Sequence, residues 1–195
     1  NYRRTGETTA IKGGKRSDGN GAIMRLAAVP CMHWQNVEKA RSIAVAQSQC
    51  THHSPLSEGC CDLMALILCR LISGDNWEQI LPYPSETNWL EEVSLLSNCN
   101  WRDKSEEEVQ STGYVIHTLE AALWCVDTTN SFQDAVLKAV NLGEDADTVG
   151  AVTGQLAGAR YGIEDIPDAW LSELIDQPRI RTIAETIFNR SLNLV

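Results

Sequence analysis

Residues 145–162 read DADTVGAVTGQLAGARYG and carry the clearest structural signal in the chain. After the opening aspartates, apolar side chains recur every three or four residues, the period of an α-helix: Val149, Val152, Leu156 and Ala159. Gly162 and the later Pro167 are residues that typically end a helix. Gly150, Gly154 and Gly158 have no side chains, which would let neighbouring helices approach closely. We therefore expect a helix here, packed tightly among others.

The segments before this helix also have helical spacing. We expect a helix over residues 131–140, capped by Ser131, and one along the apolar face from Val115 to Val126. Residues 36–49 and 55–72 predict two amphipathic helices, the second ending at Ser73-Gly74.

The remaining segments are less regular. Residues 1–22 are polar and predict a loop that enters a helix near Ala22, and residues 74–108 predict short helices with a surface loop. Because no strand pattern with a period of two competes with the helical signals, the predicted fold class is all-α. The length of 195 residues favours a single domain, 1–195.

Composition narrows the function. The formal charge of -10 makes nucleic acid an unlikely partner, and no apolar run approaches the ~20 residues that span a bilayer, so no membrane association is expected. Seven cysteines are an odd number, and no secretory signal precedes them, so we expect a cytoplasmic protein. Their spacing matches neither a zinc site nor a redox motif, so we interpret them as buried apolar residues.

Three oxygen-bearing side chains open the 145–162 helix: Asp145, Asp147 and Thr148. Carboxylates with a hydroxyl are ligands that a hard cation such as Mg²⁺ prefers. The alternative is an ordinary helix start, where Asp and Thr cap free N–H groups. The spacing alone leaves both interpretations open.

Two other segments could contact a ligand. The loop Ser17-Asp18-Gly19-Asn20-Gly21 could present backbone N–H groups to a phosphate, although Gly-Asn-Gly is also what a tight turn requires. His52, between two predicted helices, could hydrogen-bond a phosphate or a ribose hydroxyl, or could simply lie in a polar loop. We interpret His33 and His117 as structural.

Together, three segments resemble the ADP-ribosylglycohydrolase family in order and spacing. Residues 19–25, GNGAIMR, are similar to the family's G-N-G-x-x-M-R loop, and Thr51-His52 is similar to its T-H pair. Residues 140–162 are close to its N-x-G-x-D-x-D-T signature and the A-G-A-x-x-G helix that follows. Residues 113–124 look like the family helix before that signature. The resemblance covers about Asp18 to Leu171.

The resemblance implies a compact orthogonal helical bundle that hydrolyses the N- or O-glycosidic bond between ADP-ribose and a protein side chain. Two Mg²⁺ ions, with Mn²⁺ as an alternative, would orient the distal ribose and a water. Asp145, Asp147 and Thr148 would bind metal, and the two aspartates would be catalytic. The substrate would be bound by Ser17, Gly19, Asn20, Gly21, Met24, His52 and Tyr114, with Tyr114 stacking on adenine.

Two family features are missing from this sequence: an earlier helix with a Thr-Asp-Asp cluster, and a Gly-Asp-x-x-Gly segment. We therefore expect an amino-terminally incomplete domain, with a separate amino-terminal chain as a further partner besides ADP-ribosylated protein or ADP-ribose. Asp127-Thr128-Thr129 is better interpreted as a turn than as the missing cluster. The alternative function is an ADP-ribose-binding pseudoenzyme or a structural relative without chemistry. The acceptor, whether Arg, Ser or a base, stays undetermined.

Overall fold

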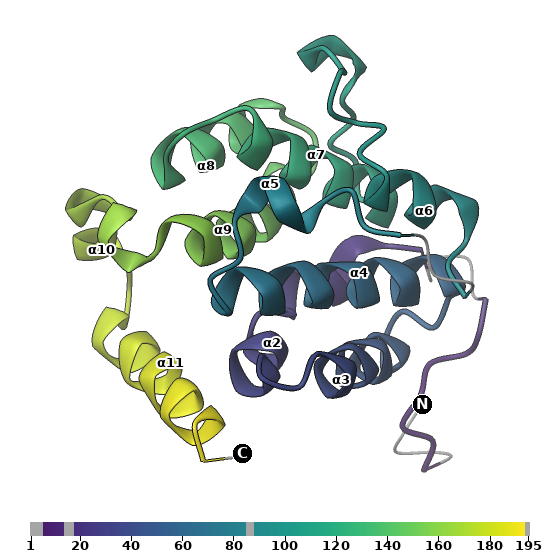
Figure 1. The fold of residues 1–195 in the computed structure, drawn as a ribbon, viewed down its shortest axis with the longest axis horizontal. Coiled ribbons are helices and arrows are strands. Elements are labelled where there is room, and N and C mark those ends of the chain that lie inside the picture. Colours follow the sequence, from purple (N-terminus) through teal and green to yellow (C-terminus); the bar gives the residue numbers. More distant parts are fainter. Residues whose placement is uncertain (1–5, 14–17, 85–87, 194–195) are drawn as a thin grey trace.

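A computed structural model describes residues 6–13, 18–84 and 88–193. In this part of the chain every regular element is helical, which confirms the predicted all-α class. The elements are η1 (Asn20–Arg25), α2 (Ala28–His33), α3 (Val37–Gln49), α4 (Pro55–Ile72), α5 (Trp77–Ile80), α6 (Glu91–Ser97), η2 (Glu106–Glu108), α7 (Val115–Asp127), α8 (Phe132–Asn141), α9 (Ala146–Tyr161), η3 (Ile163–Asp165), α10 (Asp168–Glu173) and α11 (Gln177–Ser191) (Figure 1). None of the described helices is both long and apolar enough to cross a bilayer.

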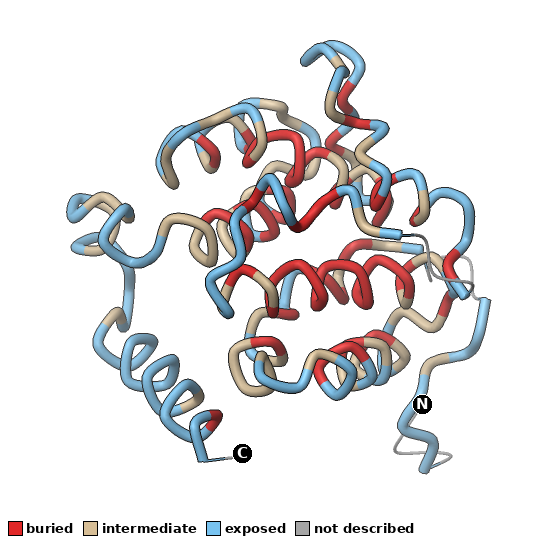
Figure 2. The backbone as a smooth tube through the Cα atoms, viewed as in Figure 1, coloured by how far each residue is buried: buried red, intermediate tan, exposed pale blue. Residues whose placement is uncertain are grey.

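The central element is α4, which begins and ends where its sequence predicts. The Ser54 side chain accepts a hydrogen bond from the Ser57 N–H, Pro55 occupies the first turn, and Ser73 ends the helix. The prediction that α4 is amphipathic is wrong, because residues 59–69 are buried without a break (Figure 2). It is surrounded by α3, α7, α9 and η1, so apolar residues suit every side of it.

The helix α9 packs against α8 at a position where the sequence predicts close approach. A Cβ on Gly150 would lie 2.9 Å from Val140 Cγ1, closer than side chains pack. Gly154 is different, since no atom lies within 4 Å of a Cβ built there. Only some of the small residues on α9 therefore serve helix packing.

The segment near Ala22 differs from its prediction in type. It forms a short 3-10 helix, η1, that begins at Asn20. The chain then enters α2, which contains Pro30. The α11 helix packs on α2, where the Trp34 and Phe188 rings stack with centroids 6.5 Å apart and Trp34 Nε1 donates to Ser191 Oγ.

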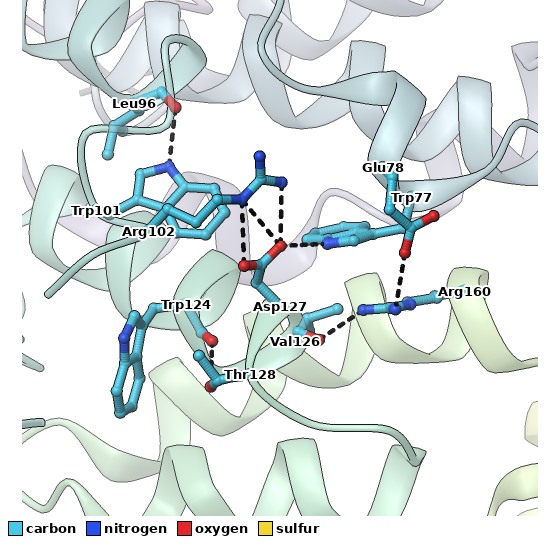
Figure 3. A network of polar contacts seen from close by, with 10 residues as sticks. All are labelled: Trp77, Glu78, Leu96, Trp101, Arg102, Trp124, Val126, Asp127, Thr128 and Arg160. Atoms are coloured by element: carbon cyan, nitrogen blue, oxygen red, sulfur yellow. Dashed lines mark hydrogen bonds and ion pairs between the residues drawn. The ribbon is translucent and has the colours of Figure 1, made fainter. Parts of the chain in front are cut away.

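Asp127, the last residue of α7, connects α7 with α5 and with the loop that follows α6 (Figure 3). Its carboxylate accepts a 2.7 Å hydrogen bond from Trp77 Nε1. It also forms an ion pair with Arg102 at 3.1 Å. The hydroxyls of Thr128 and Thr129 donate to the carbonyls of Trp124 and Cys125. This run is thus a turn that ends α7, which confirms the structural interpretation of Asp127-Thr128-Thr129.

Candidate functional site

Two loops that are distant in the sequence pair through their backbones. The Val115 N–H donates to the Asp18 carbonyl at 2.9 Å, and the Asn20 N–H donates to the Gly113 carbonyl at 3.2 Å. An isolated antiparallel bridge between Gly19 and Tyr114 lies between these bonds. The pairing fixes the start of η1 against the loop before α7.

Asp145 lies beside this pair of loops and is oriented by it. Its N–H donates to the Ser111 carbonyl, and one carboxylate oxygen accepts a hydrogen bond from Asn20 Nδ2. The same Asn20 amide donates to Thr118 Oγ1 at 2.8 Å, while Thr148 Oγ1 donates to the other Asp145 oxygen at 3.1 Å. Residues from η1 and α9 thus meet at a single carboxylate, and Thr118 of α7 contacts the same Asn20 amide.

The helix-cap interpretation fails for Asp145 and holds in part for Asp147. Asp145 precedes the first residue of α9, yet its side chain makes no capping hydrogen bond. Asp147 Oδ1 accepts from the Thr148 N–H at 2.9 Å and so serves the helix start, but the residue is exposed. Asp145 is therefore held by tertiary contacts, which an ordinary helix start would not need.

Side chains donate hydrogen bonds to four successive backbone carbonyls of η1. Arg25 Nη1 donates to the Gly21 carbonyl, and Gln47 Nε2 of α3 donates to the Ala22 carbonyl. Gln155 Nε2 of α9 donates to the carbonyls of residues 23 and 24 at 3.2 and 3.0 Å. These bonds hold the backbone of the turn in place, while Met24 is 45% exposed.

His52 lies against the same turn. A Cβ on Gly21 would be 2.8 Å from His52 Cε1, so only glycine permits the ring to pack there. Thr51 Oγ1 and His52 Nδ1 are 2.8 Å apart. Partial burial, and after it the positive charge of Arg25, lower the pKa of His52 below its ordinary value of 6.5. This shift favours the neutral imidazole at pH 7.

Tyr114 has an aromatic partner that the sequence did not reveal. Its ring meets His117 edge to face, with centroids 5.0 Å apart, and Thr112 Oγ1 lies 2.8 Å from His117 Nδ1. Burial raises the pKa of the Tyr114 phenol, and Glu92 and Asp18 raise it further. His117 thus supports Tyr114, while His33 lies in the last turn of α2.

The structure brings together most of the residues that the sequence singled out. Asn20 contacts Asp145, which contacts Thr148; Gly19 pairs with Tyr114; and Gly21 contacts His52. Ser17 lies outside the described residues. Sequence reasoning missed Ser111, Thr118 and Gln155. Thr118 carried a usable signal, because it is the one hydroxyl within the apolar run from Val115 to Val126.

The donors available to a metal ion are hard oxygens. Within residues 6–13, 18–84 and 88–193, no three His, Cys, Asp or Glu side chains are grouped so that they could hold a metal. The candidate set is two carboxylates, Asp145 and Asp147, with the Thr148 hydroxyl, and this chemistry fits Mg²⁺.

The chain is similar to known proteins in sequence and in fold. A family model described as ADP-ribosylglycohydrolase matches residues 1–193. The ADP-ribosylarginine hydrolase Tri1 of Serratia proteamaculans is 40% identical over 175 residues, 87% of this chain and 46% of the relative. The ADP-ribosyl-[dinitrogen reductase] glycohydrolase of Rhodospirillum rubrum is 33% identical over 89% of this chain and 56% of its own length. The chain thus spans about half the length of these relatives.

A solved structure described as an ADP-ribosylglycohydrolase-related protein complex has the same fold. It superposes with a TM-score of 0.88 and 31% sequence identity. The match covers 97% of this chain and 66% of that one, so the described helices correspond to a large part of the longer structure.

Proposed function

This chain belongs to the ADP-ribosylglycohydrolase family, and we propose that it hydrolyses the glycosidic bond that links ADP-ribose to a protein side chain. The observation that carries the proposal is the contact of Asn20 with Asp145, 125 residues apart, beside Thr148 and Tyr114. Packing alone does not require an amide and a hydroxyl to orient one carboxylate. A site that must hold its ligands in fixed directions does.

The proposed substrate is an ADP-ribosylated arginine. Two relatives, from Serratia proteamaculans and Pseudomonas putida, are named ADP-ribosylarginine hydrolase and are 40% and 36% identical to this chain. The bond to be broken then joins the anomeric carbon to a guanidinium nitrogen. Water supplies the new oxygen at that carbon, and its proton goes to the leaving nitrogen.

Asp145, Asp147 and Thr148 would hold Mg²⁺. When bound, Mg²⁺ supplies a Lewis acid that orients ribose hydroxyls and polarises water. Asn20 and the Thr148 hydroxyl orient the Asp145 carboxylate, one at each oxygen. Asp147 is exposed and can turn toward a cation while its other oxygen stays on the Thr148 N–H.

The rest of the substrate would lie along η1. The Gly19-Asn20-Gly21 backbone and His52 would bind the diphosphate and the proximal ribose, and Tyr114 would stack on the adenine. The side-chain hydrogen bonds to the η1 carbonyls favour such a role, because a loop already held in its binding conformation loses little entropy on binding.

We further propose that the site is completed by acidic residues outside these 195 residues, in a separate amino-terminal chain or segment. Two carboxylates are few for two divalent ions. The proposed location is the cytoplasm, which rests on the odd number of cysteines in the sequence.

The test is release of ADP-ribose from an ADP-ribosyl-arginine peptide. The 195-residue chain is assayed with Mg²⁺ or with chelator, alone and with an added family segment that carries Thr-Asp-Asp. We expect Mg²⁺-dependent release that rises at least about tenfold when the segment is added, because a two-ion site holds both sugar and water.

The matched control is Asp168→Asn, which removes an exposed carboxylate from the first turn of α10, whereas Asp147→Asn removes one from the first turn of α9. Only the Asp147 variant should lose release. Tight binding of ADP-ribose without release under any condition would contradict hydrolysis and support a binding protein. Full activity of the chain alone would refute the need for another segment.

A further inference from the structure

Arg25 is exposed and lies in the turn that we assign to phosphate binding, yet its guanidinium is already committed within the protein. Nε donates to Gln47 Oε1 at 3.0 Å, and Nη1 donates to the Gly21 carbonyl at 2.7 Å. Nη2 donates to the Gln47 carbonyl at 3.1 Å and to Thr51 Oγ1 at 2.7 Å. A guanidinium has only five N–H donors, so four internal bonds leave it poorly placed to bind a ligand.

The Thr51 hydroxyl lies within hydrogen-bond distance of two partners, Arg25 and His52, that differ in whether they can donate or accept. On one side Arg25 Nη2 can only donate, so the Thr51 oxygen must accept there. On the other side His52 Nδ1 is 2.8 Å away and can accept or donate, depending on its proton. A hydroxyl that already accepts has its proton available for Nδ1.

The contacts of the Thr51 hydroxyl with Arg25 and His52 favour one direction of hydrogen bonding. If Thr51 donates to Nδ1, each bond in the chain polarises the next and strengthens it. If Nδ1 instead carried a proton, two donors would converge on one oxygen beside a guanidinium charge. The polarised direction puts the imidazole proton on Nε2.

Gly21 provides the space in which the His52 ring lies. Its missing side chain leaves room for His52 Cε1 and Nε2, which lie 2.8 and 3.2 Å from where a Cβ would stand. Arg25 donates both to the Gly21 carbonyl and to Thr51 Oγ1. The same side chain therefore positions the glycine that the ring packs against and the hydroxyl next to Nδ1.

We propose that Arg25 and Thr51 are positioning residues that keep the His52 imidazole neutral, with its proton on Nε2, so that it donates a hydrogen bond to a phosphate oxygen of the ligand. The ligand half of this inference rests on the proposed function. The tautomer half rests only on the contacts of Arg25, Thr51 and Gly21, and it can be tested without any ligand.

The experiment is two-bond ¹⁵N–¹H correlation spectroscopy of the histidine rings in the ¹⁵N-labelled 195-residue chain at pH 7.5. Substituting His52 assigns its signals among the four histidines. We expect a proton-bearing shift for Nε2 and an unprotonated shift for Nδ1. A wild-type ring with its proton on Nδ1 would overturn the proposal by itself.

Variants then test the two positioning residues. Thr51→Val keeps the shape and removes the hydroxyl, so both tautomers should appear; Thr51→Ser should restore the single Nε2–H form. Arg25→Gln should also give a mixture, because the hydroxyl loses the donor that orients it. Thr186→Val is the matched control, since this exposed threonine on α11 donates to a backbone carbonyl and should leave His52 unchanged.

An unaltered Nε2–H pattern in Thr51→Val would overturn the relay, as would a mixture in Thr51→Ser. Titration with ADP-ribose separates this proposal from the proposed function. We expect Thr51→Val to weaken binding only about twofold, because about half of the rings would still carry the donating Nε2–H. Wild-type protein with the expected tautomer but no ADP-ribose binding would sink the proposed function and leave the relay standing.

Discussion

At the scale of single residues, Asp145 shows how a functional side chain is held. Its two carboxylate oxygens accept from different parts of the fold, Asn20 in η1 and Thr148 in α9. Each partner fixes a direction in which lone pairs remain available to a cation. Residues that orient a proposed metal ligand, such as Asn20, therefore contribute to metal binding together with the ligands themselves.

Asp147→Asn separates a metal role from a structural one. The new amide oxygen can still accept from the Thr148 N–H, so helix content and melting temperature should change little. Mg²⁺ binding should be lost, because a neutral amide replaces a carboxylate. Circular dichroism and isothermal titration with MgCl₂ measure the two effects, and a collapsed fold with unchanged Mg²⁺ binding would assign Asp147 a structural role.

The cysteines provide a second test at this scale. Burial raises the pKa of the Cys61 thiol to about 12, and burial likewise raises the pKa values of Cys69 and Cys125 to about 12. A shift from 9.0 to about 12 leaves roughly a thousandfold less thiolate at pH 8. Iodoacetamide should therefore modify the exposed Cys50 first.

Peptide mass spectrometry after timed labelling measures the order of modification. The buried thiols should become reactive only in denaturant. Labelling of Cys61 as fast as Cys50 in the folded protein would mean that α4 is not the buried centre of the fold.

At the scale of elements, a buried ion pair joins α3 to α4. Arg41 and Asp62 are 8% and 9% exposed, and both nitrogens of the Arg41 fork donate to the carboxylate, at 2.8 and 2.7 Å. Trp89 Nε1 adds a third bond at 2.7 Å. A buried charge that loses its partner is costly, so this pair fixes how the two helices align.

Asp62→Ala should lower the free energy of unfolding by about 3–5 kcal/mol, because the buried Arg41 would lose its two shortest charged hydrogen bonds and keep a 3.3 Å pair with the exposed Glu38. Replacing both residues by Met and Leu should recover most of that loss. Asp75→Ala is the matched control: the Arg70–Asp75 pair is also 2.7 Å long but more exposed, and should cost under ~1 kcal/mol. Urea denaturation gives all three values, and equal losses for Asp62 and Asp75 would refute the account.

The elements also show what the sequence could and could not predict. Helix ends with local signals, such as Pro55 and Ser73-Gly74 at α4 and Gly162 after α9, were confirmed because the residues that begin or end these helices are neighbours in the chain. The 3-10 form of η1 was not predicted, since its carbonyls are held by Gln47 and Gln155 from other helices. The site residues Ser111 and Thr118 were missed for the same reason: their roles depend on contacts across the fold.

At the scale of the whole molecule, η1 is the meeting point of the fold. It packs against α3, α4, α7 and α9, and its residues reach both Asp145 and His52. One cluster of buried apolar residues includes members from Ala22 to Ala157 in the sequence. Residues of η1 belong to this cluster, so the turn packs directly on the core. A net charge of -10 fits a protein that concentrates carboxylates near a cation, although it does not identify the cation.

The central claim is that these converging residues form one site for ADP-ribose and Mg²⁺, and linkage between the two ligands tests it most directly. Isothermal titration of the 195-residue chain with ADP-ribose, in Mg²⁺ and in chelator, measures the two dissociation constants. We predict about tenfold or tighter binding with Mg²⁺, a coupling of at least ~1.4 kcal/mol between neighbouring ligands. Equal dissociation constants in Mg²⁺ and in chelator would contradict the account.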